Sequence, residues 1–175
     1  MRRPRFLNTI LGVVIAAGCA GDPANPLEPQ APQAEASLLG GLLKPVTTLL
    51  LSCTPLPATS RTVVIGSAGG VISAGPYSLV VPNGALKAPV PITAEVVSDN
   101  VNSVRFSPEG LKFLKSATLT MSYSNCSGLG MLLPKKIAYT SEGLKLLEIL
   151  GSIDLASQKK VSANLTHFSR YAIAF

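Results

Sequence analysis

The sequence of 175 residues contains no tryptophan, a single histidine and only nine acidic residues. Carbohydrate-binding platforms usually present aromatic faces, and glycosidases need paired carboxylates, so aromatic and acidic residues at 5% and about 5% of the chain suit neither class well. The lone histidine and three cysteines have no paired-ligand spacing, so we expect no metal and no cofactor. These scarcities favour a non-enzymatic protein.

Positive charge exceeds negative charge only modestly. The formal net charge is +6 at pH 7, but Arg2, Arg3 and Arg5 supply three of these charges. Without the first 18 residues, 12 basic residues remain against 9 acidic ones. This scattered excess predicts no nucleic-acid partner.

Residues 1–18 have the layout of an export signal, with a basic start and an apolar run over Leu11–Ala17 that is too short to span a bilayer. The stretch Ala16-Ala17-Gly18-Cys19 resembles a bacterial lipobox, in which the cysteine thiol is acylated and becomes the new N-terminus. Ordinary signal-peptidase cleavage, for example after Ala20, is the alternative. The residue after Cys19 is not the aspartate that often retains lipoproteins in the inner membrane. We expect an outer-membrane lipoprotein, held by palmitate or a similar acyl chain on Cys19, that faces the periplasm or the cell surface.

A proline-rich tether is expected over residues 19–37, where prolines recur every third position. In a polyproline II conformation it would span about 50 Å at about 3.1 Å per residue. Residues 38–57 form an apolar connecting segment that is rich in leucine. This segment is expected to pack on the core, to lie on the membrane surface or to bind a partner as a helix.

Three cysteines in an exported protein leave one without a partner. If Cys19 carries an acyl chain, Cys53 and Cys126 remain as an even pair in an oxidising compartment, and we expect them to form a disulfide. The chain-entropy model assigns such a link about 4 kcal/mol. Two buried free thiols are the alternative.

Short apolar-alternating runs, separated by glycine, proline and asparagine, fill residues 58–175. The clearest run is residues 117–124, ATLTMSYS, in which apolar and hydroxyl side chains alternate. The pattern predicts an all-β domain, an antiparallel β-sandwich of about eight to ten short strands. The expected strands are residues 61–65, 71–74, 77–81, 92–97, 104–107, 111–114, 117–124, 136–139 and 144–150. Near the end of the chain, Val161, Ala163 and Leu165 share an alternating phase with Tyr171, Ile173 and Phe175.

Four lysines fall at the expected turns or strand ends. They are Lys135, Lys136, Lys159 and Lys160. We expect them to be solvated and to protect strand edges rather than to form a binding patch.

Several glycine and proline motifs resemble the ZU-five domain family, which is known from ankyrins, netrin receptors and tight-junction scaffolds and from bacterial surface proteins. The matching residues are Gly69-Gly70, Gly75, Leu79, Val81-Pro82, Gly84-Ala85, Ile92, Ser107-Pro108, Gly110, Phe113, Ala117 and Leu119. Two positions depart from the family: the loop after Pro108 reaches Gly110 early, and Ser116 replaces a common proline. The resemblance implies a β-sandwich that serves as an interaction or spacer module.

The tripeptide His167-Phe168-Ser169 resembles the site at which some ZU-five proteins cut themselves. The resemblance implies that the Ser169 hydroxyl attacks the Phe168 carbonyl with His167 as general base. Strand alternation places His167 and Ser169 on one face, in phase with Leu165 and Tyr171. The other interpretation is a bend between two strands, with a hydrogen-bonded His167 and Ser169 capping local backbone.

Three functions are therefore expected in order. The first is a lipid-anchored, non-enzymatic interaction or structural module of the cell envelope, with the membrane and an envelope or extracellular protein as partners. The second is a self-cleaving module cut between Phe168 and Ser169. The third is an extracellular ligand-binding or hydrolytic domain.

Overall fold

The computed structural model describes residues 49–175 of the chain. The predicted export signal, the acylation site Cys19, the tether and residues 38–48 lie outside the described residues. Within residues 49–175 no helix is long and apolar enough to cross a membrane. The described fold is all-β, as predicted.

Eleven strands are present among residues 49–175, rather than about eight to ten. They are β1 Thr59–Ile65, β2 Gly70–Ala74, β3 Tyr77–Val81, β4 Val90–Val96, β5 Ser103–Ser107, β6 Lys112–Ser122, β7 Lys136–Thr140, β8 Leu146–Ile149, β9 Ser152–Leu155, β10 Lys160–His167 and β11 Arg170–Ala174. Two 3-10 turns, η2 Leu129–Leu132 and η3 Ala156–Gln158, complete the described elements.

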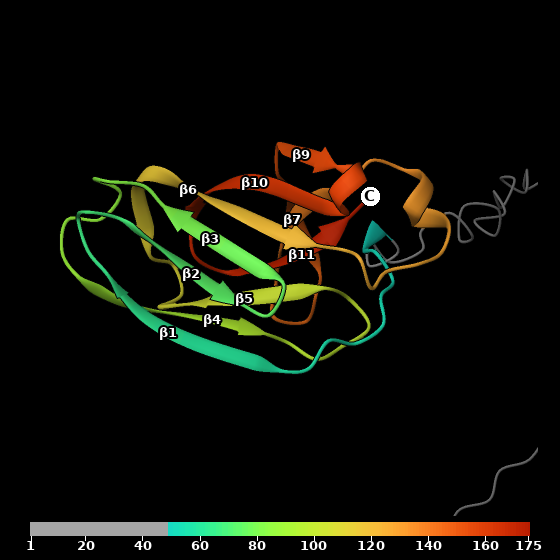
Figure 1. Cartoon of the computed structure of the whole chain (residues 1–175), viewed down its shortest axis with the longest axis horizontal. Helices are drawn as coiled ribbons and strands as arrows, with labels where there is room; N and C mark the ends of the chain where they lie inside the picture. The colour runs from blue at the N-terminus through green and yellow to red at the C-terminus, as the bar shows by residue number, and fades with distance from the viewer. Residues whose placement is uncertain (1–48) are drawn as a thin grey trace, which may run out of the picture. The chain divides into compact units, whose positions relative to one another are not determined.

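The strands form two antiparallel sheets, which Figure 1 shows as two layers. The six-stranded sheet has the order β1-β4-β5-β11-β7-β8, and the five-stranded sheet has the order β2-β3-β6-β10-β9. Consecutive strands β10 and β11 lie in different sheets, and each has a neighbouring strand on both sides. The arrangement is sandwich-like, with buried residues of both sheets in one hydrophobic cluster.

The alternation predicted for residues 117–124 sets the register of β6 against β10. Leu119 lies opposite Ala163 and both are buried, whereas Thr120 lies opposite Ser162 and their hydroxyls are 2.8 Å apart. Apolar side chains therefore face the other sheet, and hydroxyl side chains face outward.

Strand β11 is buried on both faces. Tyr171 and Ile173 belong to the main core, while Ala172 and Ala174 pack in a second cluster with Leu50. This second cluster covers part of the outer face of the six-stranded sheet.

The start of the described chain lies against β11. Leu50 forms a bridge with Ala174, and the Leu51 N–H donates to the Ile173 carbonyl oxygen at 2.9 Å. Leu51 is fully buried. The described end of the apolar segment 38–57 therefore packs on the core, which was one of its three expected roles.

Two predicted strand boundaries were wrong. Residues 111–114 and 117–124 were expected to be separate strands, but one long strand, β6, covers most of both. The strand predicted from residue 144 begins at Leu146, because Leu144 adopts a left-handed φ of 60° in the turn and its N–H donates to Ser141.

Glycine is required at one turn that carries the family resemblance. Gly69 has φ 78°, and a Cβ at this position would overlap the backbone of Val81 and Pro82. The glycine thus lets the β1–β2 turn pass close to the end of β3.

Candidate functional site

The predicted tripeptide 167–169 forms the crossover between the two sheets. Strand β10 ends at His167 in the five-stranded sheet, and β11 begins at Arg170 in the six-stranded sheet. A register shift between Leu165 and His167 precedes the crossover. The predicted alternation therefore does not continue from Leu165 through Ser169, because the strand ends between them.

Phe168 anchors this corner in the core. Its ring stacks on Phe106 with centroids 5.1 Å apart, and it forms a T-shaped pair with the ring of Phe113 with centroids 4.9 Å apart. Its N–H donates to the Leu111 carbonyl oxygen at 2.8 Å, and its carbonyl oxygen accepts from the Gly110 N–H at 3.0 Å. Residues 110–111 thus hold both backbone groups of Phe168, and the Gly110 N–H contacts the carbonyl of the peptide that self-cleavage would break.

The His167 side chain lies among aromatic residues. Its ring is 5.0 Å from the ring of Tyr139 in an edge-to-face arrangement, and its Nδ1 is 3.4 Å from the Phe168 carbonyl oxygen. The Tyr171 hydroxyl donates to the His167 carbonyl oxygen at 2.6 Å, and burial raises the pKa of Tyr171. Among the described residues, no hydrogen bond joins His167 to Ser169.

A small hollow of about 230 Å³ opens beside this corner. His167, Tyr171, Asn164, Thr166 and Glu148 contribute to its lining. The Gly110 N–H polarises the Phe168 carbonyl, so the corner has one feature of an acyl-transfer site, although the base is not hydrogen-bonded to the nucleophile.

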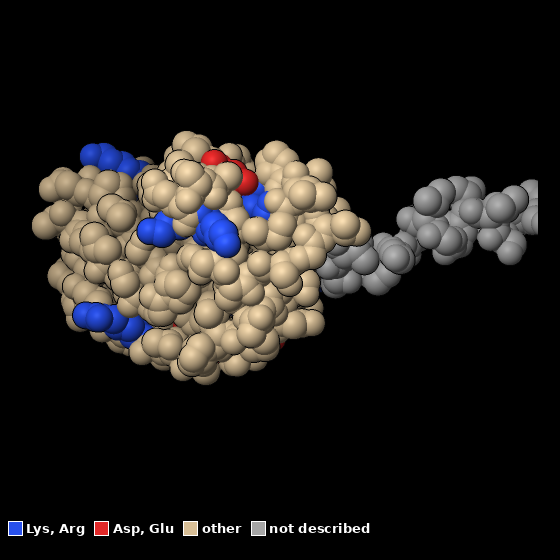
Figure 2. Space-filling model, turned by 45° about the vertical axis from the view of Figure 1, so that its right-hand side comes forward, with Lys and Arg blue, Asp and Glu red and all other residues tan. Residues whose placement is uncertain are grey.

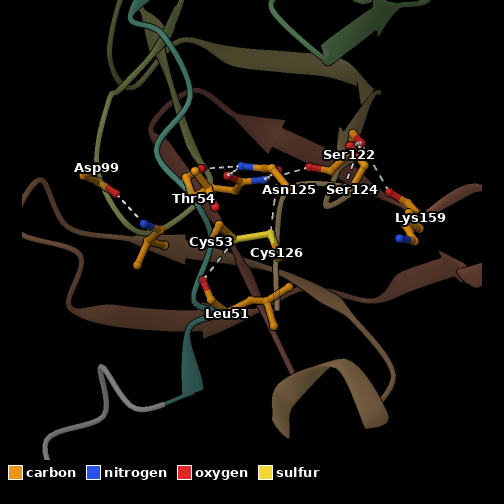
Figure 3. Close-up of a disulfide and its surroundings, with 11 residues drawn as sticks. Leu51, Cys53, Thr54, Asp99, Ser122, Ser124, Asn125, Cys126 and Lys159 are labelled. Carbon is orange, nitrogen blue, oxygen red and sulfur yellow. Dashed lines mark hydrogen bonds between the residues drawn. A yellow bond between two sulfur atoms is a disulfide. The ribbon is translucent and has the colours of Figure 1, made fainter. Parts of the chain in front are cut away.

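Cys53 and Cys126 form a disulfide, as predicted from the cysteine count. Figure 3 shows the bridge between the start of the described chain and the segment after β6. Beside it, the Asn125 side-chain amide donates to the Thr54 carbonyl oxygen at 2.6 Å and to Asn102 Oδ1 at 2.9 Å. The disulfide and these amides fix residues 52–54 to the body.

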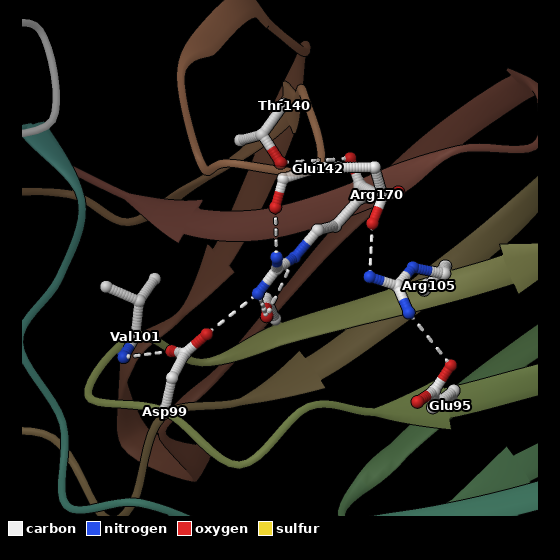
Figure 4. Close-up of polar contacts among 8 residues, drawn as sticks. Glu95, Asp99, Val101, Arg105, Thr140, Glu142 and Arg170 are labelled. Atoms are coloured by element: carbon white, nitrogen blue, oxygen red, sulfur yellow. Dashed lines mark hydrogen bonds and ion pairs between the residues drawn. The ribbon is translucent and has the colours of Figure 1, made fainter.

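A buried ion pair that the sequence analysis missed lies one residue after the tripeptide. The Arg170 guanidinium donates to Asp99 Oδ2 at 2.7 Å, to the Ser103 hydroxyl at 2.9 Å and to the Glu142 carbonyl oxygen. Figure 4 shows this arginine reaching from β11 to two loops. The arginine at the start of the apolar run RYAIAF could have indicated this ion pair. A charged side chain in a buried strand requires a partner of opposite charge.

A second, more exposed arginine lies nearby. Arg105 on β5 donates to Glu95 Oε2 at 3.1 Å and to Glu142, and the hydrogen bond that it donates to Glu142 is the main cause that raises the pKa of Arg105. Both arginines thus contact the 141–145 turn. These charged groups hold loops onto the outer face of the six-stranded sheet.

A larger hollow of about 420 Å³ lies between η2 and the end of β9. Inside it, the Tyr123 hydroxyl donates to Asp154 Oδ1 at 2.7 Å, and the Lys135 N–H donates to Asp154 Oδ2 at 2.8 Å. Burial, followed by the hydrogen bond to Asp154, raises the pKa of Tyr123 to about 12. Lys135 is only 3% exposed, with Nζ 5.5 Å from the centre of the Tyr123 ring, so the expectation that it is solvated was wrong.

Charged side chains are sparse on the face of the molecule that is in view in Figure 2. Figure 2 shows lysine and arginine as separate groups between wide uncharged areas on the face in view. Within residues 49–175, no three histidine, cysteine, aspartate or glutamate side chains lie close enough together to hold a metal ion.

No protein-family model matches the chain, and no curated protein sequence matches it.

Proposed function

We propose that the chain is a lipid-anchored, non-enzymatic module of the cell envelope, which binds an envelope or extracellular protein or serves as a structural unit there. The observation that carries this proposal is the disulfide between Cys53 and Cys126. Disulfides form and persist in oxidising compartments, which supports export. The pairing also leaves Cys19 as the odd cysteine, directly after the sequence that resembles an export signal.

The contacts of the polar side chains support a structural role for them. Arg170 and Asp99 join β11 to the loop before β5, and Asp154 joins Tyr123 to the start of β7. Each of these groups is engaged in holding two segments together. None of them is a free acid or base aimed into a cleft.

We further propose that the two sheets form a β-sandwich of the ZU-five type. The resemblance in the sequence supports this. Four glycines of the resembling motifs have a positive φ, which explains why glycine occupies those positions. They are Gly69, Gly75, Gly84 and Gly110. The role of a spacer or interaction module rests on the resemblance alone.

Metabolic labelling with palmitate and intact-mass analysis of the mature protein test the proposal. The full chain, expressed in a bacterium that processes lipoproteins, should take up label and show the mass of an acylated cysteine at position 19. Cys19→Ser should abolish the label, while Cys53→Ser should retain it. A mature wild-type protein without an acyl chain would contradict the anchor.

A self-cleaving module is the second candidate, favoured by the hydrogen bond from the Gly110 N–H to the Phe168 carbonyl oxygen. The Ser169 hydroxyl would add to the Phe168 carbonyl carbon, the amide C–N bond would break to leave an ester and a free amine, and water would hydrolyse the ester. Denaturing mass analysis distinguishes the outcomes. A chain ending at Phe168 in wild type but not in Ser169→Ala would establish cleavage, and an intact C-terminus in the wild type would rule it out.

A further inference from the structure

Three leucines project into solvent from the turn η2 and the residue after it. Leu129 is 86% exposed, Leu132 is 83% exposed and Leu133 is 51% exposed. We call residues 129–133 the leucine turn. Contiguous large apolar side chains on a protein surface mark interaction sites more often than chance exposure does.

The backbone of the leucine turn is docked on the core. A Cβ at Gly130 would lie 2.6 Å from the ring of Phe175 and 2.9 Å from the Leu51 side chain, so only glycine allows this approach. The Ser127 N–H donates to the Ser52 carbonyl oxygen at 3.2 Å, next to the Cys53–Cys126 disulfide. Because the space beneath the turn is filled, its leucines cannot fold inward.

The leucine turn also lies where the described chain begins. Leu49 is the first described residue, and its carbonyl oxygen accepts from the Phe175 N–H at 3.0 Å. Cys19, the proposed acylation site, lies thirty residues earlier in the sequence. The turn is therefore at the end of the body that the sequence connects to the proposed anchor.

Three exposed lysines lie at the end of the two sheets from which the leucine turn leaves, where β6 ends and β7 begins. Lys159 lines the same hollow as Leu132 and Leu133, and Lys136 and Lys160 are exposed at the starts of β7 and β10. The one acidic residue in the lining, Asp154, already accepts hydrogen bonds from Tyr123 and Lys135. An apolar tip with a basic rim matches the interface of a bilayer that contains anionic lipid.

We propose that the leucine turn inserts into the interfacial layer of an anionic lipid bilayer, with Lys136, Lys159 and Lys160 against the headgroups. The composition favours lipid over a protein partner, because protein interfaces are enriched in aromatic residues and arginine and depleted of lysine. The inference rests on the proposed function in one respect: the anchor would keep a membrane within reach. It gives the body a defined orientation on that membrane.

Vesicle flotation of the full chain carrying Cys19→Ser tests the inference without any contribution from an acyl chain. The vesicles contain phosphatidylcholine with or without phosphatidylglycerol. Adding Leu129→Ser and Leu132→Ser should lower the partition coefficient about tenfold. The matched control carries Val64→Ser and Leu114→Ser, two exposed apolar residues outside the leucine turn, and should leave partitioning unchanged. Both variants contain residues 1–18, so any contribution of that segment to binding is the same in each.

The basic rim is tested separately with Lys159→Gln and Lys160→Gln in the same background. Each substitution should lower partitioning about fivefold on vesicles with phosphatidylglycerol and have little effect on phosphatidylcholine alone. Circular dichroism should show the wild-type spectrum for every variant, since all the replaced side chains are exposed.

Equal partitioning of the leucine and control variants would overturn the inference. So would a concentration-dependent dimer in sedimentation that Leu129→Ser and Leu132→Ser abolish while vesicle binding persists, because a second copy would then cover the turn. Palmitate labelling of the wild type decides the anchor and does not depend on the leucines. The two proposals can therefore fail separately.

Discussion

The outer faces of the two sheets differ in how they meet solvent. On the five-stranded sheet, the outward side chains of β6 and β10 are polar and pair across the strands, as in Thr118 with Asn164 at 3.1 Å. On the six-stranded sheet, Ala172 and Ala174 of β11 are fully buried on the outward side and pack with Leu50, which is bridged to Ala174. One sheet is therefore amphipathic, whereas the centre of the other is buried on both faces.

The difference shows that the stability of the six-stranded sheet depends on the segments that pack on its outer face. On its outer face, Ala172 and Ala174 pack in one cluster with Leu50 from the start of the described chain. Val101, the turn residue Leu144 and Leu146 of β8 pack against this cluster. The disulfide at Cys53 and the ion pair of Arg170 hold these segments in place. The stability of this half of the domain is thus sensitive to residues distant in sequence from β11.

Removal of the disulfide should cause the largest effect. Replacing both Cys53 and Cys126 by serine frees a loop whose ends are 73 residues apart in sequence, and should lower the free energy of unfolding by about 4 kcal/mol. Urea unfolding of wild type and double variant measures the loss. Equal midpoints for the two proteins would mean that the segments on the outer face are held without the cross-link.

Asp99→Ala should have the next largest effect, about 3 kcal/mol, because it leaves the buried Arg170 guanidinium without its carboxylate partner. Glu95→Ala is the matched control, since its partner Arg105 is more exposed, and it should cost less than about 1 kcal/mol. Thermal and urea unfolding would compare them. Equal losses would show that burial does not distinguish the two arginines.

Leu50→Ala should lower stability by about 2 kcal/mol, because it removes the apolar cover from Ala172 and Ala174. Val80→Ala, an exposed apolar position on β3 of the five-stranded sheet, is the control and should change stability by less than about 0.5 kcal/mol. Hydrogen exchange of the β11 amides should rise in Leu50→Ala only. Unchanged protection would contradict the role of the cover.

The smallest effect concerns pH and the five-stranded sheet. The pKa of Tyr123 is raised above its ordinary value of 10 to about 12, so the folded state favours the neutral phenol. Its contribution is complete below pH 10 and is lost as the pH rises from 10 to about 12. The melting temperature should fall over this range, less steeply in Tyr123→Phe. If the melting temperatures of wild type and Tyr123→Phe fall equally between pH 10 and pH 12, this prediction is wrong.

The same comparison explains what the sequence could predict. The alternation in residues 117–124 identified β6 because one face of that strand is exposed to solvent. The odd number of cysteines identified the disulfide. The phase of Tyr171 and Ile173 also indicated β11, but it did not show that Ala172 and Ala174 on the other face are buried. The move of the chain from one sheet to the other at Phe168 left no periodic signal. Lys135 was misjudged because a turn position was taken to mean exposure, whereas Tyr123 and Leu133 enclose it.

The central place of β11 has a consequence for the order in which the domain forms. Until residues 170–174 have been made, β5 and β7 have no strand between them, and the six-stranded sheet exists only as two separate pieces. A chain that lacks this segment cannot close its core. Folding of the six-stranded sheet therefore waits for the last of the described strands.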